Sequence, residues 1–162
     1  PNVYAYRFDW DEQPTILGMD FSFLLGAGHG LEIPFVMGDF DFGKQTRFLF
    51  TKKNENERNK LSKVIMQYWT HFAKKGYPSN ESENITLWDK WPKGGINQNR
   101  IMILDTEQSN APRMSNGYVP HNKLVTIFEN DERSLKVDNK CNFLEDVYSW
   151  VDNWKSKNNF CQ

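Results

Sequence analysis

The chain has 162 residues, of which 38% are hydrophobic and 15% aromatic, and this composition suits one folded domain and argues against disorder. Its 20 basic and 21 acidic residues leave a formal net charge of −1, so the sequence lacks the basic surface typical of proteins that bind nucleic acid or anionic membranes. No apolar stretch approaches the roughly 20 residues of a membrane-spanning helix. Because the chain begins with Pro1 and not with Met, we expect its start to be a cleavage point.

The first predicted element is a strand over Val3–Phe8, read from the β-branched and aromatic run "VYAYRF". The run has no polar alternation, so we expect the strand to be buried on both faces, inside a sheet. Residues 9–34 hold four glycines and two prolines, too many for regular structure, and they place His29 on a loop that leaves the strand.

A helix is predicted over residues 57–75, where apolar side chains recur at intervals of three and four. Asn54 or Asn56 is a candidate cap for its start, and Gly76 followed by Pro78 predicts its end. The apolar stripe, which we interpret as a buried face, is formed by Leu61, Val64, Ile65, Tyr68, Trp69, Phe72 and Ala73.

The second half of the chain is less regular. Residues 76–100 are a long polar connection, residues 100–105 ("RIMILD") predict a short strand, and residues 123–129 a further strand. Residues 140–156 predict a terminal amphipathic helix. Two good helices and so few strands leave the first strand short of neighbours, so we interpret the chain as one piece of a larger sheet.

The two cysteines, Cys141 and Cys161, lack the CxxC spacing of a zinc or redox site. Asn80 and Asn84 begin N-x-[ST] tripeptides and are candidate glycosylation sites. Together these features favour an exported protein, whether extracellular, periplasmic or lumenal.

Among the three histidines, His29 is the best candidate for a catalytic role. Gly28 and Gly30 flank it and remove side-chain bulk, so that its imidazole could approach another group closely. We expect His71, at the border of the helical stripe, and His121, in a loop, to be surface or boundary residues.

A histidine base needs a nucleophile to deprotonate and a carboxylate to orient it, and the sequence does not supply a recognisable set. No serine lies in a G-x-S-x-G motif, and Ser22 lacks the sequence of a strand-to-helix elbow. No second histidine stands near His29 at the spacing of metal ligands, so we expect no metal and no cofactor. The carboxylates near His29 in sequence are Asp20, Glu32 and Asp39.

Two motifs resemble the C-terminal portion of the type-B carboxylesterases, a family that includes the cholinesterases. "HGLEIPFVMG" at His29–Gly38 matches the family pattern His-Gly-x-Glu-[IL]-x-Phe-[VI]-x-Gly, and residues 68–78 match Tyr-Trp-x-x-Phe-Ala-x-x-Gly-x-Pro. The likeness is strong over residues 3–105, and residues 106–137 have no clear counterpart.

The resemblance implies that residues 1–162 are the C-terminal part of one α/β-hydrolase domain, a mixed sheet flanked by helices that is incomplete without an N-terminal chain. In that family the triad order is Ser, Asp or Glu, His, so His29 would be the general base. The serine, the acid and the oxyanion hole would belong to the N-terminal chain, and Glu32 would support His29 from outside the triad. The substrate would be a small ester.

Leu31 occupies the position where cholinesterases usually carry Tyr, so the resemblance does not by itself imply choline esters as substrates, although aromatic residues elsewhere could replace that Tyr. Leu24, Leu25 and Leu31 would instead give the site an apolar wall. By resemblance Cys141 would bond a cysteine upstream of this chain, and a free buried thiol or a bond to Cys161 are the alternatives. Two other functions stay open: a catalytically silent, esterase-like adhesion domain such as the neuroligins, and a self-sufficient binding module.

Overall fold

The computed structural model describes residues 1–41, 43–44, 46–79, 85–92, 99–117, 121–131, 140–147 and 149. Its internal contacts divide the chain into two compact units, Pro1–Tyr118 and Val119–Gln162, and each is described by itself.

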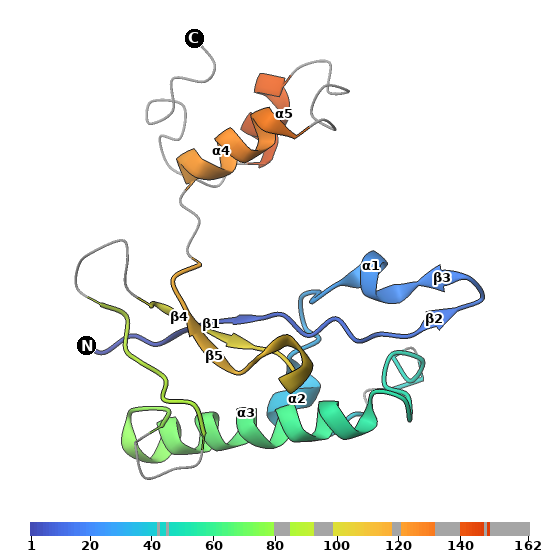
Figure 1. Cartoon of the computed structure of the whole chain (residues 1–162), viewed down its shortest axis with the longest axis vertical. Coiled ribbons are helices and arrows are strands. Elements are labelled where there is room, and N and C mark those ends of the chain that lie inside the picture. Colours follow the sequence, from blue (N-terminus) through green and yellow to red (C-terminus); the bar gives the residue numbers. More distant parts are fainter. Residues whose placement is uncertain are drawn as a thin grey trace. The chain divides into compact units, whose positions relative to one another are not determined.

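The first unit is built on a three-stranded sheet in the order β1–β4–β5 (Figure 1). β1 (Ala5–Phe8) and β4 (Ile101–Leu104) run parallel, with Ala5 opposite Ile101 and Phe8 opposite Leu104. β5 (Arg113–Ser115) pairs with β4 in the antiparallel sense. Two parallel strands need a long crossover, and helix α3 (Glu55–Lys75) lies within it. β4 confirms the strand predicted at residues 100–105. β5 was not predicted, because its residues show no recognisable strand pattern.

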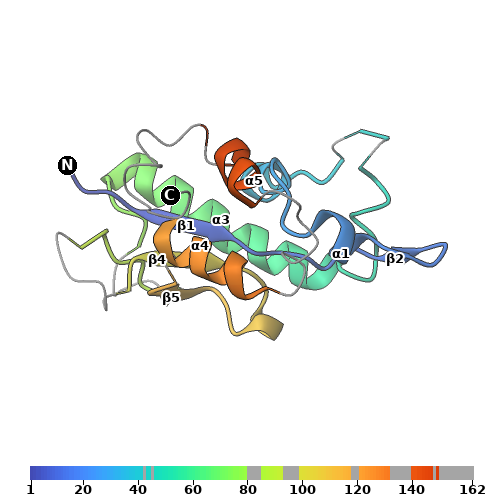
Figure 2. The same ribbon diagram turned by 90° about the horizontal axis from the view of Figure 1, so that it is seen from above.

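The expectation that the first strand is buried on both faces is wrong for this chain. Tyr6 is 42% exposed, and the exposed Arg7 forms an ion pair with Asp9 at 2.6 Å. Among the described residues β1 pairs only with β4, so it is an edge of the sheet. α3 lies along one face of β1 in both views (Figures 1 and 2), and Tyr4 and Tyr6 contact its side chains. Apolar residues on an edge strand stay partly exposed when no neighbour covers them.

Helix α3 confirms the most strongly periodic prediction. It begins two residues earlier than expected, and Leu61, Ile65 and Tyr68 of the predicted stripe are buried. Gly76 ends it in the left-handed conformation (φ 79°), and its N–H donates to the carbonyl of Phe72.

Asn54 occupies the position before α3 but does not cap the helix with its side chain. Its Nδ2 donates instead to the carbonyls of Glu12 and Leu49, at 2.9 and 2.8 Å. The side chain therefore ties the start of α3 to the segment that follows β1.

The residues between β1 and α3 form four short elements where the sequence predicts an irregular segment. These are β2 (Thr15–Ile16), β3 (Met19–Asp20), α1 (Phe21–Leu25) and α2 (Ile33–Met37). β2 and β3 make a hairpin whose two turn residues, Leu17 and Gly18, both have positive φ (51° and 80°), as a type I′ turn requires.

The core of the first unit lies between the sheet and α3. Its buried members are Trp10, Phe35, Leu61, Ile65, Tyr68, Trp88, Met102 and Leu104. Two hydrogen bonds hold the connection between α3 and β4 against this core. The Tyr68 hydroxyl donates to the carbonyl of Thr86 at 2.7 Å, and the N–H of Trp91 donates to the carbonyl of Val3.

The second unit corrects another prediction. Residues 123–129, expected as a strand, lie in helix α4 (His121–Asn130), and the described part of the terminal helix is α5 (Lys140–Val147). Phe128 of α4 stacks on Phe143 of α5 with ring centroids 5.2 Å apart. The β-branched run misleads because its apolar residues also recur at helical spacing, and packing against α5 overrides strand propensity. Among the described residues no helix has the length and apolarity to cross a membrane.

Candidate active site

His29 lies in a tight turn between α1 and α2, as the glycine content predicts. The carbonyl of Gly28 accepts a hydrogen bond from the N–H of Leu31 at 3.2 Å, and Gly30, the third residue of the turn, has a φ of 87°. A type II turn needs this positive φ at its third position, which glycine adopts without strain. His29 is the second residue of the turn, and its side chain is exposed to solvent.

Close contacts hold the start of the turn. A Cβ atom added to Gly28 would lie 3.1 Å from the carbonyl oxygen of Leu25 and 3.7 Å from Cδ1 of Leu31. Of the three leucines predicted for the apolar wall, Leu31 has its side chain near Gly28, whereas Leu25 approaches Gly28 through its backbone carbonyl. Leu24, the third, is 63% exposed on α1.

Gln13 holds the segment that leads into the His29 turn. Its side chain is buried, and Nε2 donates to the carbonyl of Gly26 at 2.8 Å, while the N–H of Gly26 donates to the carbonyl of Ser22. This bond satisfies the buried Nε2 donor, which would be costly to leave unmet, while Oε1 of the same amide is buried without a partner among the described residues. Sequence reasoning missed Gln13, since its partner lies 13 residues away and no motif marks it.

The far end of the turn is anchored by α2. Phe35 is fully buried, with its ring centroid 5.0 Å from that of Trp10 and 5.1 Å from that of Phe8. Ser62 of α3 donates to the carbonyl of Phe35 at 2.8 Å. His29 thus sits in a short, clamped turn downstream of the carboxyl end of a parallel strand, which is where α/β proteins place their active-site loops.

Two of the three nearby carboxylates have other roles. Asp20 accepts hydrogen bonds from the N–H groups of Ser22 and Phe23, and so caps α1. The hydroxyl of Ser22 also donates to Asp20, and these bonds, the hydroxyl first, lower the pKa of that carboxyl. Asp39 accepts from the N–H of Asp41 at 2.9 Å. In the described part of the chain, the hydrogen bonds of Ser22, Asp20 and Asp39 thus go to groups other than His29.

Glu32, the third carboxylate, begins α2 without capping it by its side chain. Partial burial, and secondly the negative charge of Glu32, raise the pKa of the Tyr6 phenol on β1. The Glu32 carboxylate therefore acts electrostatically on the first strand. In the described ranges no hydrogen bond reaches the imidazole of His29. Tyr6, like Gln13, is a residue that sequence reasoning did not connect with this turn.

The remaining predicted positions lie elsewhere. His71, on α3, is partly buried, and its Nδ1 lies 2.8 Å from the carbonyl oxygen of Tyr77, which is the boundary role expected for it. His121 is the first residue of α4, not part of a loop. The described part of the chain holds no group of His, Cys, Asp and Glu suited to a metal ion.

The candidate modification sites lie mostly outside the described part of the chain. Cys141 lies on α5 and is not a free thiol, which removes one of the three alternatives for it. Asn80, Asn84 and Cys161 fall outside the described residues.

The chain is similar in sequence to proteins of one known family. A model of the carboxylesterase family matches residues 1–123. The para-nitrobenzyl esterase of Bacillus subtilis (strain 168) is 32% identical over 105 residues, covering 65% of this chain and 18% of that protein. The acetylcholinesterase of Danio rerio is 28% identical over 167 residues, covering 96% of this chain and 24% of that protein.

Solved structures of similar chains include a PNB esterase with 33% identity and a TM-score of 0.45, covering 64% of this chain and 18% of that one. This chain spans 18% to 24% of the length of these relatives. The family match covers both the His29 turn and α3, so the resemblance drawn from their motifs is confirmed. The chain belongs to the carboxylesterase family, and its sheet and helices are a segment of an α/β-hydrolase fold.

Proposed function

We propose that this chain provides the general-base histidine of a serine carboxylesterase. The observation that carries the proposal is the His29 turn, an exposed imidazole on a clamped turn after a parallel strand, within the part that the carboxylesterase model matches. The nucleophilic serine and the triad acid belong to an N-terminal chain of the same esterase, which is the partner of this one.

In this mechanism His29 accepts the proton of the serine hydroxyl as the serine oxygen attacks the ester carbonyl. The negative charge that develops on the carbonyl oxygen is stabilised by backbone N–H groups of the N-terminal chain. His29 then gives its proton to the departing alcohol, which leaves an acyl-serine. A water molecule, deprotonated by His29 in turn, releases the acid and restores the serine.

The distribution of hydrogen bonds supports a carboxylate from the N-terminal chain as the partner of the His29 ring. Asp20 and Asp39 already accept bonds from backbone N–H groups. Glu32 immediately precedes α2, and we assign it a supporting role, in which its charge acts between the turn and β1.

For the substrate we propose an uncharged ester with aliphatic groups. The Leu31 side chain lies near Gly28, the residue before His29, and Leu24 and Leu25 add exposed apolar surface on α1. An apolar wall favours alkyl and acyl chains over a quaternary ammonium group, which prefers aromatic faces. Replacing Leu31 with Tyr should therefore raise turnover of choline esters relative to butyl esters of the same acid. An unchanged ratio would contradict this assignment.

We also propose that the protein is exported, that Asn80 and Asn84 carry glycans, and that Cys141 forms a disulfide in the mature protein. Peptide mass spectrometry under non-reducing conditions tests the disulfide. A Cys141 peptide linked to a sequence outside residues 1–162 would join this chain to the N-terminal one, whereas a link to Cys161 would leave the two chains joined by packing alone.

The direct test of the function is a fluorescent fluorophosphonate, which reacts covalently with activated serines. The native preparation is labelled and separated on a denaturing gel with and without reductant. We expect the label on a larger polypeptide that copurifies with this chain or is continuous with it. A correctly folded preparation that takes up no label would contradict an esterase and favour a silent, adhesion-type domain.

A further inference from the structure

The two ends of the His29 turn are held in different ways. On the downstream side, α2 is packed into the core through Phe35, which is fully buried. On the upstream side, α1 has no buried residue, and its Phe23 and Leu24 side chains are exposed. Among the described residues, apolar packing therefore fixes the downstream end of the turn and leaves the upstream end to other interactions.

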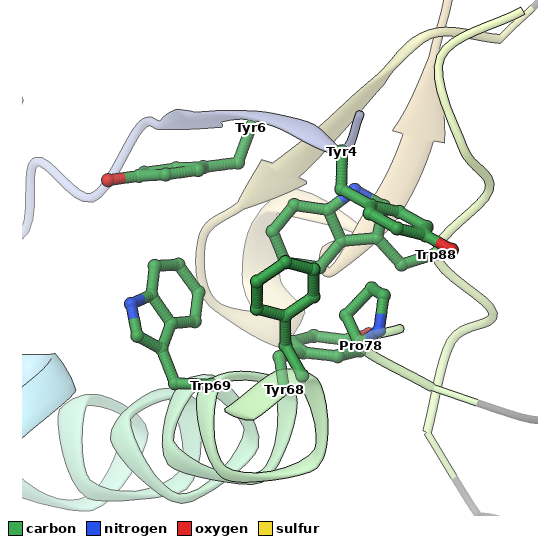
Figure 3. Close-up of a pocket in the computed structure, with 7 residues that line it drawn as sticks. Tyr4, Tyr6, Tyr68, Trp69, Pro78 and Trp88 are labelled. Carbon is green, nitrogen blue, oxygen red and sulfur yellow. The ribbon is translucent and has the colours of Figure 1, made fainter. Parts of the chain in front are cut away.

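The segment that supplies these interactions follows β1. Aromatic rings hold β1 itself to α3 around a pocket of about 220 Å³, where Tyr6 meets Trp69 at 5.2 Å between ring centroids (Figure 3). Buried aromatic packing continues as far as Trp10, which is fully buried. Beyond Trp10, hydrogen bonds hold the chain, and three of them meet at Glu12 and Gln13.

Glu12 is fixed by two of these bonds, which come from distant parts of the chain. The hydroxyl of Thr106, a buried residue just beyond the carboxyl end of β4, donates to Oε1 of Glu12 at 2.6 Å. Nδ2 of Asn54, at the start of α3, donates to the carbonyl of Glu12 at 2.9 Å. Glu12 therefore joins the segment after β1 to both β4 and α3, and the backbone of Gln13 starts from a fixed point.

Gln13 connects this fixed point to the turn. Its Nε2 donates to the carbonyl of Gly26 at 2.8 Å. Gly26 ends α1 with a φ of 51° and lies three residues before His29. A chain so rich in glycine has wide backbone freedom unless it is held. In the described ranges no hydrogen bond reaches the imidazole, so the place of His29 depends on the anchors of its backbone.

The second polar atom of the Gln13 side chain is an independent observation. Oε1 is buried without a partner among the described residues. Burying an unmet oxygen costs at least as much free energy as a typical hydrogen bond contributes. A methionine of similar size would avoid that cost, so the amide adds little to stability. Its distinct effect is the bond from Nε2 to Gly26, and this effect falls on the turn.

We propose that Gln13 is a positioning residue of the esterase, which fixes the upstream end of the turn through Gly26 and so places the His29 imidazole. Glu12, held by Thr106, keeps Gln13 in register. This inference rests on the proposed function, which gives His29 its role. A general base must lie within hydrogen-bond reach of the proton that it takes, and a misplacement of about 1 Å can cost about 100-fold in rate.

The first test is Gln13→Met in the native protein, together with its N-terminal chain. The substitution removes the donor and also the unpartnered oxygen, and it keeps the size of the buried side chain. The melting temperature should therefore change by no more than about 2 °C. We expect kcat for an uncharged aliphatic ester to fall by about tenfold or more. An unchanged kcat would overturn the proposal.

Thr86→Val is the matched control. The Thr86 hydroxyl is also partly buried and also donates to a distant backbone carbonyl, that of Pro112 at 2.8 Å. This bond lies outside the segment that leads to His29, so the control should keep its kcat. A fall in kcat equal to that of Gln13→Met would indicate a general loss of structure and would overturn the positioning role.

Gln13→Glu tests the hydrogen bond itself through the pH profile. An ionised carboxylate only accepts hydrogen bonds, whereas a protonated carboxyl group can donate to the Gly26 carbonyl. Burial raises the pKa of a carboxyl group, so the protonated form becomes populated in mildly acidic solution. We expect the kcat of this variant, divided by that of the native protein at the same pH, to rise by about threefold or more from pH 8 to pH 5.5. A constant ratio would contradict the donor role.

A pair of variants tests Glu12. Glu12→Gln keeps an oxygen that accepts from the Thr106 hydroxyl, whereas Glu12→Ala removes it. We expect the first variant to keep kcat within about twofold and the second to lower it by about fivefold or more. Equal effects would contradict the part of Glu12 in placing Gln13.

Amide hydrogen exchange separates this inference from the proposed function. In Gln13→Met we expect the amides of residues 26–30 to exchange about tenfold faster than in the native protein, while those of α3 keep their rates. Ester turnover that needs His29 but stays normal in Gln13→Met overturns the positioning role and leaves the esterase. Faster exchange of the turn in a protein without ester turnover keeps Gln13 as its anchor and removes the esterase.

Discussion

Gly38 ends the helix that anchors the His29 turn, and replacing it with alanine should destabilise the protein by two separable effects. Gly38 has a φ of 68°, where an alanine loses about 1 to 2 kcal/mol. A Cβ atom there would also lie 2.8 Å from Sδ and 3.1 Å from Cε of Met66, and relieving such an overlap costs roughly 1 kcal/mol. The expected loss in the free energy of unfolding is therefore about 2 to 3 kcal/mol.

A double-mutant cycle separates the overlap from the backbone strain. Gly38→Ala, Met66→Ala and the double variant are compared by urea denaturation. Met66→Ala removes the atoms that would overlap the new Cβ. The loss in unfolding free energy of the double variant should therefore be about 1 kcal/mol smaller than the sum of the losses of the two single variants. The backbone strain at residue 38 remains in the double variant. Additivity to within about 0.5 kcal/mol would refute the close approach of Met66 to Gly38.

Three further outcomes follow from the packing and the charges. Phe35→Ala removes a fully buried ring and should cost about 3 to 5 kcal/mol in unfolding free energy, with a loss of ester turnover because the His29 turn loses its anchor; turnover at the normal level would contradict the clamp. Burial first, and then the charges of Asp11 and Glu12, raise the pKa of the Asp105 carboxyl. The folded state therefore holds this proton more tightly than the unfolded chain does. The stability that the protonated carboxyl contributes at low pH is lost as the pH rises through the raised pKa. Asp105→Asn should therefore increase the melting temperature more at pH 7 than at pH 3, and an equal change at both pH values would contradict the burial of that charge. Glu32→Gln should lower the pKa of Tyr6 without restoring its ordinary value, because burial is the larger cause; ¹³C NMR of labelled tyrosine rings measures this, and an unchanged Tyr6 titration would contradict their proximity.

The elements that the sequence predicts well are those with long, regular patterns. α3 carries one apolar stripe over residues 61–73 and has glycine at its end, and β4 is a compact apolar run, so local rules suffice for both. β1 lies where the sequence predicts a strand, but it is not buried on both faces, because among the described residues it pairs with β4 on one side only. Residues 123–129 could not be assigned from sequence, because their apolar run fits both the two-residue repeat of a strand and the 3.6-residue repeat of a helix. Packing on α5 selects the helix.

The candidate site was less accessible to local reasoning. His29 stands out by its glycines, yet its interpretation as a base came from the resemblance of its motif to a family. The clamp around it depends on contacts between distant residues, such as Gln13 with Gly26 and Ser62 with Phe35, and no sequence spacing encodes them.

The central claim is that His29 is the base of the ester hydrolysis, and the substitution His29→Ala tests it most directly. The matched control is His71→Ala, since His71 is on α3 and lies against the carbonyl of Tyr77. With an uncharged aliphatic ester as substrate, we expect His29→Ala to lower kcat by about 10⁴-fold or more while the melting temperature stays within about 2 °C. The control should keep its kcat. A His29→Ala protein that retains more than a tenth of the normal kcat would contradict the account.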